Sequence, residues 1–359
     1  MTIQVAVMNG YGVALASDRH VFRGGDTRST GQDVKLHRLR GPVPAAMMAS
    51  GPFAVFGVPV SRLVLRLERA LAASAGAGPE AMCESLLHAL EKPIEGPVVG
   101  ADADADLLAE VAGQVVGPAL DEGGDARAAL QRLVAEMANA PGCRDAESVE
   151  ASVRTAWEAS LPRLVQRVST PALAQALREA PELCGRAVAG ALARDWRADL
   201  FITVGLCCPE TGVPAMLALR LWKGIGRRLH FVSRLQSDYE VAWRAGRTVV
   251  VAQGSGRMVV ESLVDGLGDE HWESLSEAGR DVLRPGMDGR WDRAHGRLGV
   301  SSPRELSAVA TGLVRGAEVV GYLTRQSEST MAEIDCLCLT PRGTLEGTLP
   351  AGPVLTPPA

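Results

Sequence analysis

Two apolar runs joined by an Asn-Gly pair open the chain and predict a β-hairpin. The runs are Gln4 to Met8 and Val13 to Ser17, and they hold few charges. Asn9-Gly10 lies between them, and both of its residues tolerate the positive φ angles that tight hairpin turns require. A hairpin of this length brings Asp18 back to the level of Thr2. The start of the chain is therefore expected at one end of an antiparallel sheet, next to an acidic side chain.

Thr2 follows the initiator methionine directly. If Met1 is removed, Thr2 carries both a hydroxyl that can attack a carbonyl and a free α-amino group that can take its proton. An α-amine has an unperturbed pKa of roughly 7.7 to 8.0, so it can act as a base near neutral pH, where a lysine ordinarily cannot. A small second residue is also common without any catalytic role, so the case for Thr2 depends on its neighbours.

Lysine is rare in this chain. Of the 37 basic residues only three are lysines, namely Lys35, Lys92 and Lys223. A lysine retained in such a background indicates a site that needs a compact ammonium group whose pKa can shift, which the planar guanidinium of arginine does not provide. Lys35 lies where a strand is expected to begin. It is a candidate site residue, and an ordinary surface lysine is the alternative.

The spacing of these residues resembles the N-terminal region of the proteasome β-type peptidases, including the bacterial ATPase-partnered peptidase HslV and the Anbu group of bacterial proteasome homologues. In that family an acidic residue follows the nucleophilic threonine by sixteen positions and a lysine by about thirty-two; here Asp18 follows Thr2 by sixteen and Lys35 by thirty-three. Ala49-Ser50-Gly51 resembles the family's turn whose backbone N–H forms the oxyanion hole. A helix is expected after it, from Ala54 to Ala73.

The resemblance resumes in the C-terminal part and covers roughly residues 1–92 and 199–345. Ser255, in a Gly-Ser-Gly turn, matches the serine that the family places beside the threonine amine. The matching segments are a central hairpin, the strand that leads into this turn, a helix and the last core strand, at 200–206 with 215–221, 249–256, 303–323 and 334–339.

One segment departs from the family pattern. The family carries an Asp-x-x-Ser-Gly-Gly-like turn before the last strand, where the aspartate and the serine support the N-terminal amine. Residues 327–332 of this chain read Ser-Glu-Ser-Thr-Met-Ala, without the glycine pair or the aspartate. Ser329 or Thr330 could supply the hydroxyl, and Glu328 could supply the charge.

The resemblance implies an α+β fold, a four-layer αββα sandwich of the N-terminal-nucleophile hydrolase class. Its core would be residues 1–92 and 199–346. Between them, residues 93–198 consist of Ala/Leu/Val-rich segments with helical periodicity and intervening glycines and prolines such as Pro162, which predicts an all-helical insertion of four to six short helices. Residues 347–359 are rich in proline and small residues and are expected to form a flexible tail.

The implied mechanism assigns one role to each candidate. The Thr2 hydroxyl attacks an amide carbonyl, and the α-amine accepts its proton through water. Lys35 would lower the pKa of the hydroxyl and the amine, and Asp18 would keep Lys35 charged and oriented. The Gly51 N–H would stabilise the oxyanion, an effect of about 3 kcal/mol for other such donors. The reaction needs no metal and no cofactor.

Composition excludes several other classes of function. The net charge of −5 and the pI near 5.8 argue against a nucleic-acid or anionic-membrane partner. No apolar run approaches the roughly 18 residues that cross a bilayer, and no signal-peptide pattern precedes the hairpin, so a cytoplasmic chain is expected. The seven cysteines show no metal-ligand spacing and are expected to be reduced and mostly buried. His20 and His37 flank the proposed site and could line a substrate pocket or have no role in it.

The leading functional prediction is a threonine peptidase that acts on peptides or unfolded proteins and assembles as a homo-oligomeric ring. Whether an ATPase or adaptor partner exists stays open. Between residues 98 and 150 the chain holds eleven acidic residues and three basic ones, which suits a solvated face or a surface for a basic partner. Two alternatives remain: a non-catalytic ring or scaffold subunit, and an N-terminal-nucleophile amidase or acyltransferase that acts on a small molecule.

Overall fold

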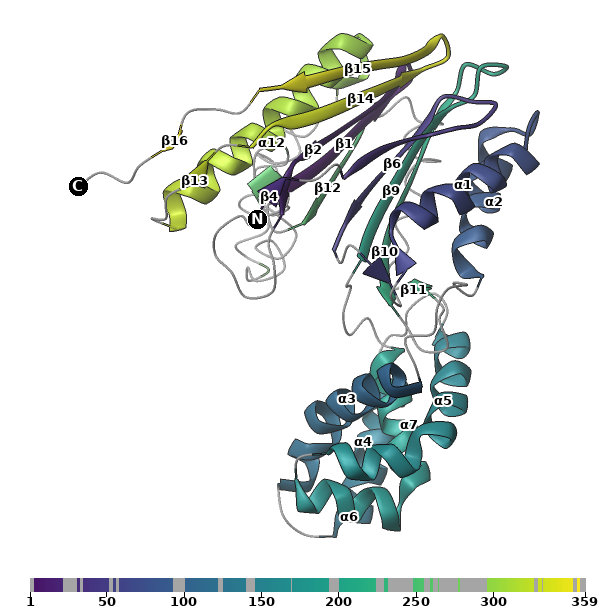
Figure 1. The fold of residues 1–359 in the computed structure, drawn as a ribbon, viewed down its shortest axis with the longest axis vertical. Helices are drawn as coiled ribbons and strands as arrows, with labels where there is room; N and C mark the ends of the chain where they lie inside the picture. The colour runs from purple at the N-terminus through teal and green to yellow at the C-terminus, as the bar shows by residue number, and fades with distance from the viewer. Residues whose placement is uncertain are drawn as a thin grey trace.

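The structure, a computed structural model, combines antiparallel β-sheets with helices, as expected for an α+β protein (Figure 1). Two of the candidate site residues, Thr2 and Ser255, lie outside the residues that it describes. The described residues are 3–21, 31–32, 35–51, 54–55, 58–92, 101–121, 125–139, 146–168, 170–193, 200–223, 229–231, 248–254, 259–260, 264, 277, 296–325, 329–330, 332–350 and 354–355.

The first sheet contains the N-terminal hairpin. Its strand order is β12-β1-β2-β14-β15, and every neighbouring pair is antiparallel. The strands are β1 (Ile3–Asn9), β2 (Gly12–Asp18), β12 (Val249–Gly254), β14 (Ile334–Thr340) and β15 (Gly343–Leu349). The two-residue loop of the hairpin is Gly10-Tyr11 and not Asn9-Gly10, because Asn9 still pairs with Gly12. The Asn9 side-chain oxygen instead accepts the Tyr11 N–H at 2.8 Å.

The second sheet has the order β11-β10-β9-β6-β5, and it is antiparallel throughout. Its strands are β5 (Leu36–Leu39), β6 (Ala45–Ser50), β9 (Leu200–Cys207), β10 (Pro214–Lys223) and β11 (Leu229–Phe231). Strands β9 and β10 form the hairpin expected in this part of the chain. Short two-residue strands also pair, β3 (His20–Val21) with β4 (Gly31–Gln32) and β7 (Ala54–Val55) with β8 (Val58–Pro59).

The two sheets pack against each other through one face of each. Met8 and Leu15 of the first sheet share a buried cluster with Val204 of the second. Gly205 permits this close approach, because a Cβ atom there would lie 2.8 Å from Val13 Cγ1. The facing sides of both sheets are therefore mostly apolar and are tightly packed.

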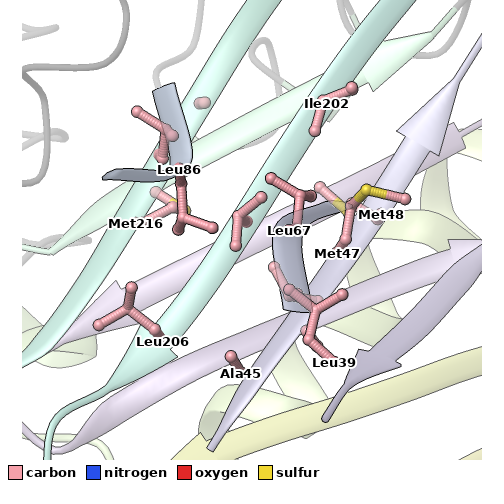
Figure 2. Packing of buried hydrophobic residues seen from close by; sticks show 14 of the residues in the cluster. Leu39, Ala45, Met47, Met48, Leu67, Leu86, Ile202, Leu206 and Met216 are labelled. Atoms are coloured by element: carbon pink, nitrogen blue, oxygen red, sulfur yellow. The ribbon is translucent and has the colours of Figure 1, made fainter. Parts of the chain in front are cut away.

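Helices cover the outer faces of the sheets. Helices α1 (Ser61–Ala73) and α2 (Pro79–Glu91) lie on the second sheet, where Leu67 and Leu86 join the buried cluster that contains Met48 and Met216 (Figure 2). Helix α12 (Pro303–Arg325) lies on the first sheet, and Leu306, Ala310 and Val314 pack there with Ile3 and Val5.

Helix α1 begins later than expected. The sequence predicts helix from Ala54, but residues 54–59 hold the β7–β8 pair, and the helix begins at Ser61. Pro59 accounts for the difference, because a proline disfavours helical backbone at the residue before it. A helix in this segment can therefore start only at or after Pro59.

Helices α3 to α7 occupy the region predicted to be an all-helical insertion, and they bury a cluster of their own. They are α3 (Ala101–Asp121), α4 (Ala126–Asn139), α5 (Ala146–Arg167), α6 (Pro171–Glu179) and α7 (Pro181–Leu192). In Figure 1 they form a group apart from both sheets. Two of them are not short: α3 contains Pro118 and α5 contains Pro162, which was expected to end a helix. Packing of Val153, Trp157 and Leu164 on both sides of Pro162 stabilises α5 across the missing hydrogen bond.

The last residues are not a free tail where the structure describes them. Gly347 to Leu349 complete β15, and β16 (Val354–Leu355) pairs with β13 (Ser329–Thr330). The expectation of a flexible tail from residue 347 is therefore wrong for these residues, because backbone pairing with strands far away in the sequence orders them. Within the described ranges, no helix is long and apolar enough to cross a membrane.

Candidate active site

A buried ion pair lies at the end of the N-terminal hairpin. Asp18 is the last residue of β2 and is fully buried, and Lys35, which directly precedes β5, is 7% exposed. The Lys35 Nζ donates to Asp18 Oδ1 at 2.7 Å. The other carboxylate oxygen accepts the backbone N–H of Ile3 at 3.0 Å. The pair predicted from the sequence thus forms, and it is joined directly to the first described residue of the chain.

Burial dominates the electrostatics of this carboxylate. Removal from water raises the pKa of Asp18, and the Lys35 ammonium is the main influence that opposes the rise. Strand pairing fixes both partners, since Asp18 pairs with Ile334 of β14 and the Lys35 carbonyl accepts the Ala49 N–H at 3.2 Å. The site therefore presents a rigid, desolvated ammonium group near the start of β1.

Gln4 links the two sheets beside this pair, and the sequence prediction missed it. Its side-chain nitrogen donates to the Ala49 carbonyl at 2.8 Å and to Ser17 Oγ at 3.2 Å. Gln253, its cross-strand partner, donates to Thr203 Oγ1 at 2.6 Å. The side-chain oxygens of both glutamines are buried without a hydrogen-bond partner among the described residues. The signal that could have identified these two glutamines is a single polar residue within an otherwise apolar strand.

Gly51 directly follows β6, the strand that Gln4 contacts. Its φ angle is +125°, a conformation that residues with a Cβ atom rarely adopt. Gly51 is exposed, unlike the preceding Ser50. The backbone at the candidate oxyanion position thus requires glycine and faces solvent.

A second charged cluster follows Asp18 in the chain. The Arg19 guanidinium donates to both carboxylate oxygens of Asp335, at 2.8 and 2.6 Å, and also to Glu333. The Arg19 N–H donates to the Glu333 carbonyl at 3.1 Å. These bonds fix the segment before β14 against the end of β2. No local pattern predicts these bonds, because the partners are more than 300 residues apart.

The other predicted site residues are described only in part. Ile3 and Gly254, the described neighbours of Thr2 and Ser255 in the chain, are paired across β1 and β12. Ser329 and Thr330 form β13, but their side chains are not described. Glu328, the expected source of charge in this turn, and the His20 side chain also lie outside the description. His37 is half-buried on β5.

Among the described residues, no cluster of three or more histidine, cysteine, aspartate or glutamate side chains could hold a metal ion.

No known protein-family model matches the sequence, and no curated protein is significantly similar to it.

Proposed function

We propose that this chain is a threonine-type peptidase in which Thr2, exposed by removal of Met1, is the nucleophile. The observation that carries the proposal is the hydrogen bond from the Ile3 N–H to Asp18, because it joins the residue next to Thr2 to the buried Asp18–Lys35 pair. A free α-amine at the start of this strand would lie in the field of a desolvated ammonium, which favours the neutral, basic form of an amine. The likeness of spacing to the proteasome β-type peptidases supports threonine chemistry in particular.

The arrangement of layers also supports this class. Two antiparallel sheets pack face to face, with α1 and α2 on one outer side and α12 on the other. We therefore infer a four-layer αββα sandwich of the N-terminal-nucleophile type, formed by residues 1–92 and 199–346. Residues 93–198 are proposed to be a helical insertion in that core, because α3 to α7 bury a separate cluster.

The proposed reaction proceeds through an ester. The Thr2 Oγ bonds to the carbonyl carbon of the substrate, and its proton passes through water to the α-amine. The Gly51 N–H stabilises the oxyanion. The carbon–nitrogen bond then breaks, and the α-amine returns the proton to the leaving amine. A water molecule hydrolyses the ester, which releases the acid product and restores the hydroxyl. Peptides and unfolded proteins are the proposed substrates, and a homo-oligomeric ring is the proposed assembly.

Intact mass spectrometry and one substitution test the nucleophile. The mature protein is expected to lack Met1, because a retained methionine would acylate the proposed base. Thr2→Ala should abolish hydrolysis of fluorogenic peptides and labelling by a threonine-reactive epoxyketone, and it should leave assembly unchanged. Thr2→Ser retains a hydroxyl and should keep part of the activity. The matched control is Thr155→Ala, which changes an exposed threonine on α5 and should have no effect.

Each outcome separates the proposal from its alternatives. Retained Met1 together with no labelling indicates a non-catalytic ring or scaffold subunit. Hydrolysis that continues undiminished in Thr2→Ala removes the nucleophile assignment. The third outcome is labelling of Thr2 without peptide turnover, together with monomers or dimers in electron microscopy. This result indicates an amidase or acyltransferase that acts on a small molecule.

A further inference from the structure

Glu318 is a buried carboxylate on the face of α12 that packs against the first sheet. Only 6% of the residue is exposed, and its neighbours Val314 and Ala317 belong to the apolar cluster beneath the helix. A carboxylate in such surroundings is destabilising unless hydrogen bonds and an opposite charge compensate for the lost water.

Hydrogen bonds and an opposite charge compensate this carboxylate. Arg315, one turn earlier on α12, donates to Glu318 Oε2 at 2.8 Å, and the backbone N–H of Ala332 donates to Oε1 at 3.3 Å. Arg315 also donates to the Pro350 carbonyl at 2.8 Å. Ala332 lies just before β14 and Pro350 just after β15, and Ile334 pairs with Leu349, so the Arg315–Glu318 pair fixes the open end of this hairpin to the helix. From the same end the chain continues into the paired strands β13 and β16.

These contacts lie at the Asp18 end of the sheet. Ala332 is two residues before Ile334, which pairs with Asp18. Ala14 and Ala16 of β2 pack in the α12 cluster, and because side chains alternate along a strand, Asp18 is on the same side of the sheet as Glu318. Burial raises the pKa of Glu318 to about 7, and the Asp18 carboxylate adds to the rise while Arg315 opposes it.

We propose that Glu318 is a positioning residue for the candidate active site: it anchors the segment that enters β14 beside Asp18, and it supplies a second negative charge to the ammonium groups there. This proposal rests on the proposed function. Residues 327–332 lack the aspartate that relatives of the proteasome type carry in this turn, and Glu318 provides a carboxylate from the neighbouring helix instead.

The remaining charged and titratable groups near Glu318 come from three elements. Strand β1, which also packs on α12, contributes none among its described residues. On the side of the sheet that faces α12, the groups are Arg315 on α12, Asp18 with its partner Lys35 at β2, and Cys336 and Cys338 on β14. Asp335 lies on the opposite face, where it is bonded to Arg19.

Two variants separate anchoring from charge. Glu318→Gln keeps an oxygen that can accept the Ala332 N–H but carries no charge, and Glu318→Ala removes both. A nearby negative charge stabilises the protonated form of an amine, so its loss lowers the pKa of the catalytic base. In Glu318→Gln the acid limb of the kcat/KM profile should move to lower pH by a few tenths of a unit. Glu318→Ala should show the same shift and a further loss of kcat of about tenfold at every pH. Glu346→Gln, on exposed β15, is the matched control and should match the wild type.

The possible results are distinguishable. An acid limb that moves in Glu318→Gln but not in Glu346→Gln supports the proposal. If the limb stays in place, and both Glu318 variants lose the same factor at every pH, the residue acts only through stability and the proposal is wrong. A wild type that shows neither turnover nor Thr2 labelling refutes the proposed function, and the role of Glu318 in it.

Discussion

Replacement of Lys35 by methionine tests the central feature of the site, the buried pair with Asp18. Methionine has a similar length but no charge, so Asp18 keeps the Ile3 N–H and loses its counter-ion. Because Asp18 is fully buried and the Lys35 side chain is 6% exposed, solvent screening does not reduce the effect. Removing one partner of a buried pair costs about 3 to 5 kcal/mol. Because Asp18 keeps the hydrogen bond from Ile3, we expect the low end of this range. The free energy of unfolding should fall by about 3 kcal/mol at pH 8.

The loss should depend on pH in a direction that the structure fixes. The pKa of Asp18 is already raised above its ordinary value of 3.8, and removal of Lys35 raises it further. A carboxyl whose folded-state pKa is raised contributes most stability below its unfolded pKa and loses it as the pH rises through the folded value. The extra loss of stability in Lys35→Met should therefore reach its maximum at pH values well above the raised pKa of Asp18. It should become smaller as the pH falls below that pKa.

Hydrogen exchange of the β1 and β2 amides, followed by mass spectrometry over a pH series, measures this free energy in the sheet itself. The double variant with Asp18→Asn removes the uncompensated charge and should recover at least about 1 kcal/mol relative to Lys35→Met. Lys92→Met, which changes an exposed lysine after α2, should stay within about 0.5 kcal/mol of the wild type. A Lys35→Met variant as stable as that control at pH 8, or equally destabilised at every pH, would refute the electrostatic argument.

Two further predictions concern packing and cysteine reactivity. Gly185→Ala should destabilise the α3–α7 region by roughly 1 to 3 kcal/mol in hydrogen exchange, because its Cβ atom would lie 2.9 Å from Trp157 Nε1. Gly113→Ala on α3 meets no atom within 4 Å and should instead stabilise by about 0.5 to 1 kcal/mol; equal effects would contradict the packing at Trp157. Cys83 and Cys207 should resist iodoacetamide at pH 8 until the protein is denatured, because burial raises the pKa of each thiol to about 12. Rapid modification of either in the native state would show that its site opens.

Local patterns and the family resemblance together predicted many of the elements correctly. Two apolar runs with turn residues between them marked β1 and β2, and the resemblance to the proteasome β-type peptidases marked β9, β14 and α12. The predictions failed where a distant partner outweighed the local pattern. Pro162 would end an isolated helix, yet α5 continues through it. The composition of the chain end predicts a flexible tail, yet β16 in that segment pairs with β13.

The N-terminal hairpin and the candidates Asp18 and Lys35 could be predicted from the sequence, because strand period, turn chemistry and the rarity of lysine are all local or compositional. The residues that surround the Asp18–Lys35 pair could be identified only from the folded chain. Gln4 and Glu318 are ordinary polar residues in their own segments. Their role depends on burial and on hydrogen bonds with Ala49 and Ala332, which strand pairing and helix packing bring to the same end of the sheets. The energy of a buried polar group is set by the partners that surround it, and partners separated by long stretches of chain leave no pattern in its own segment.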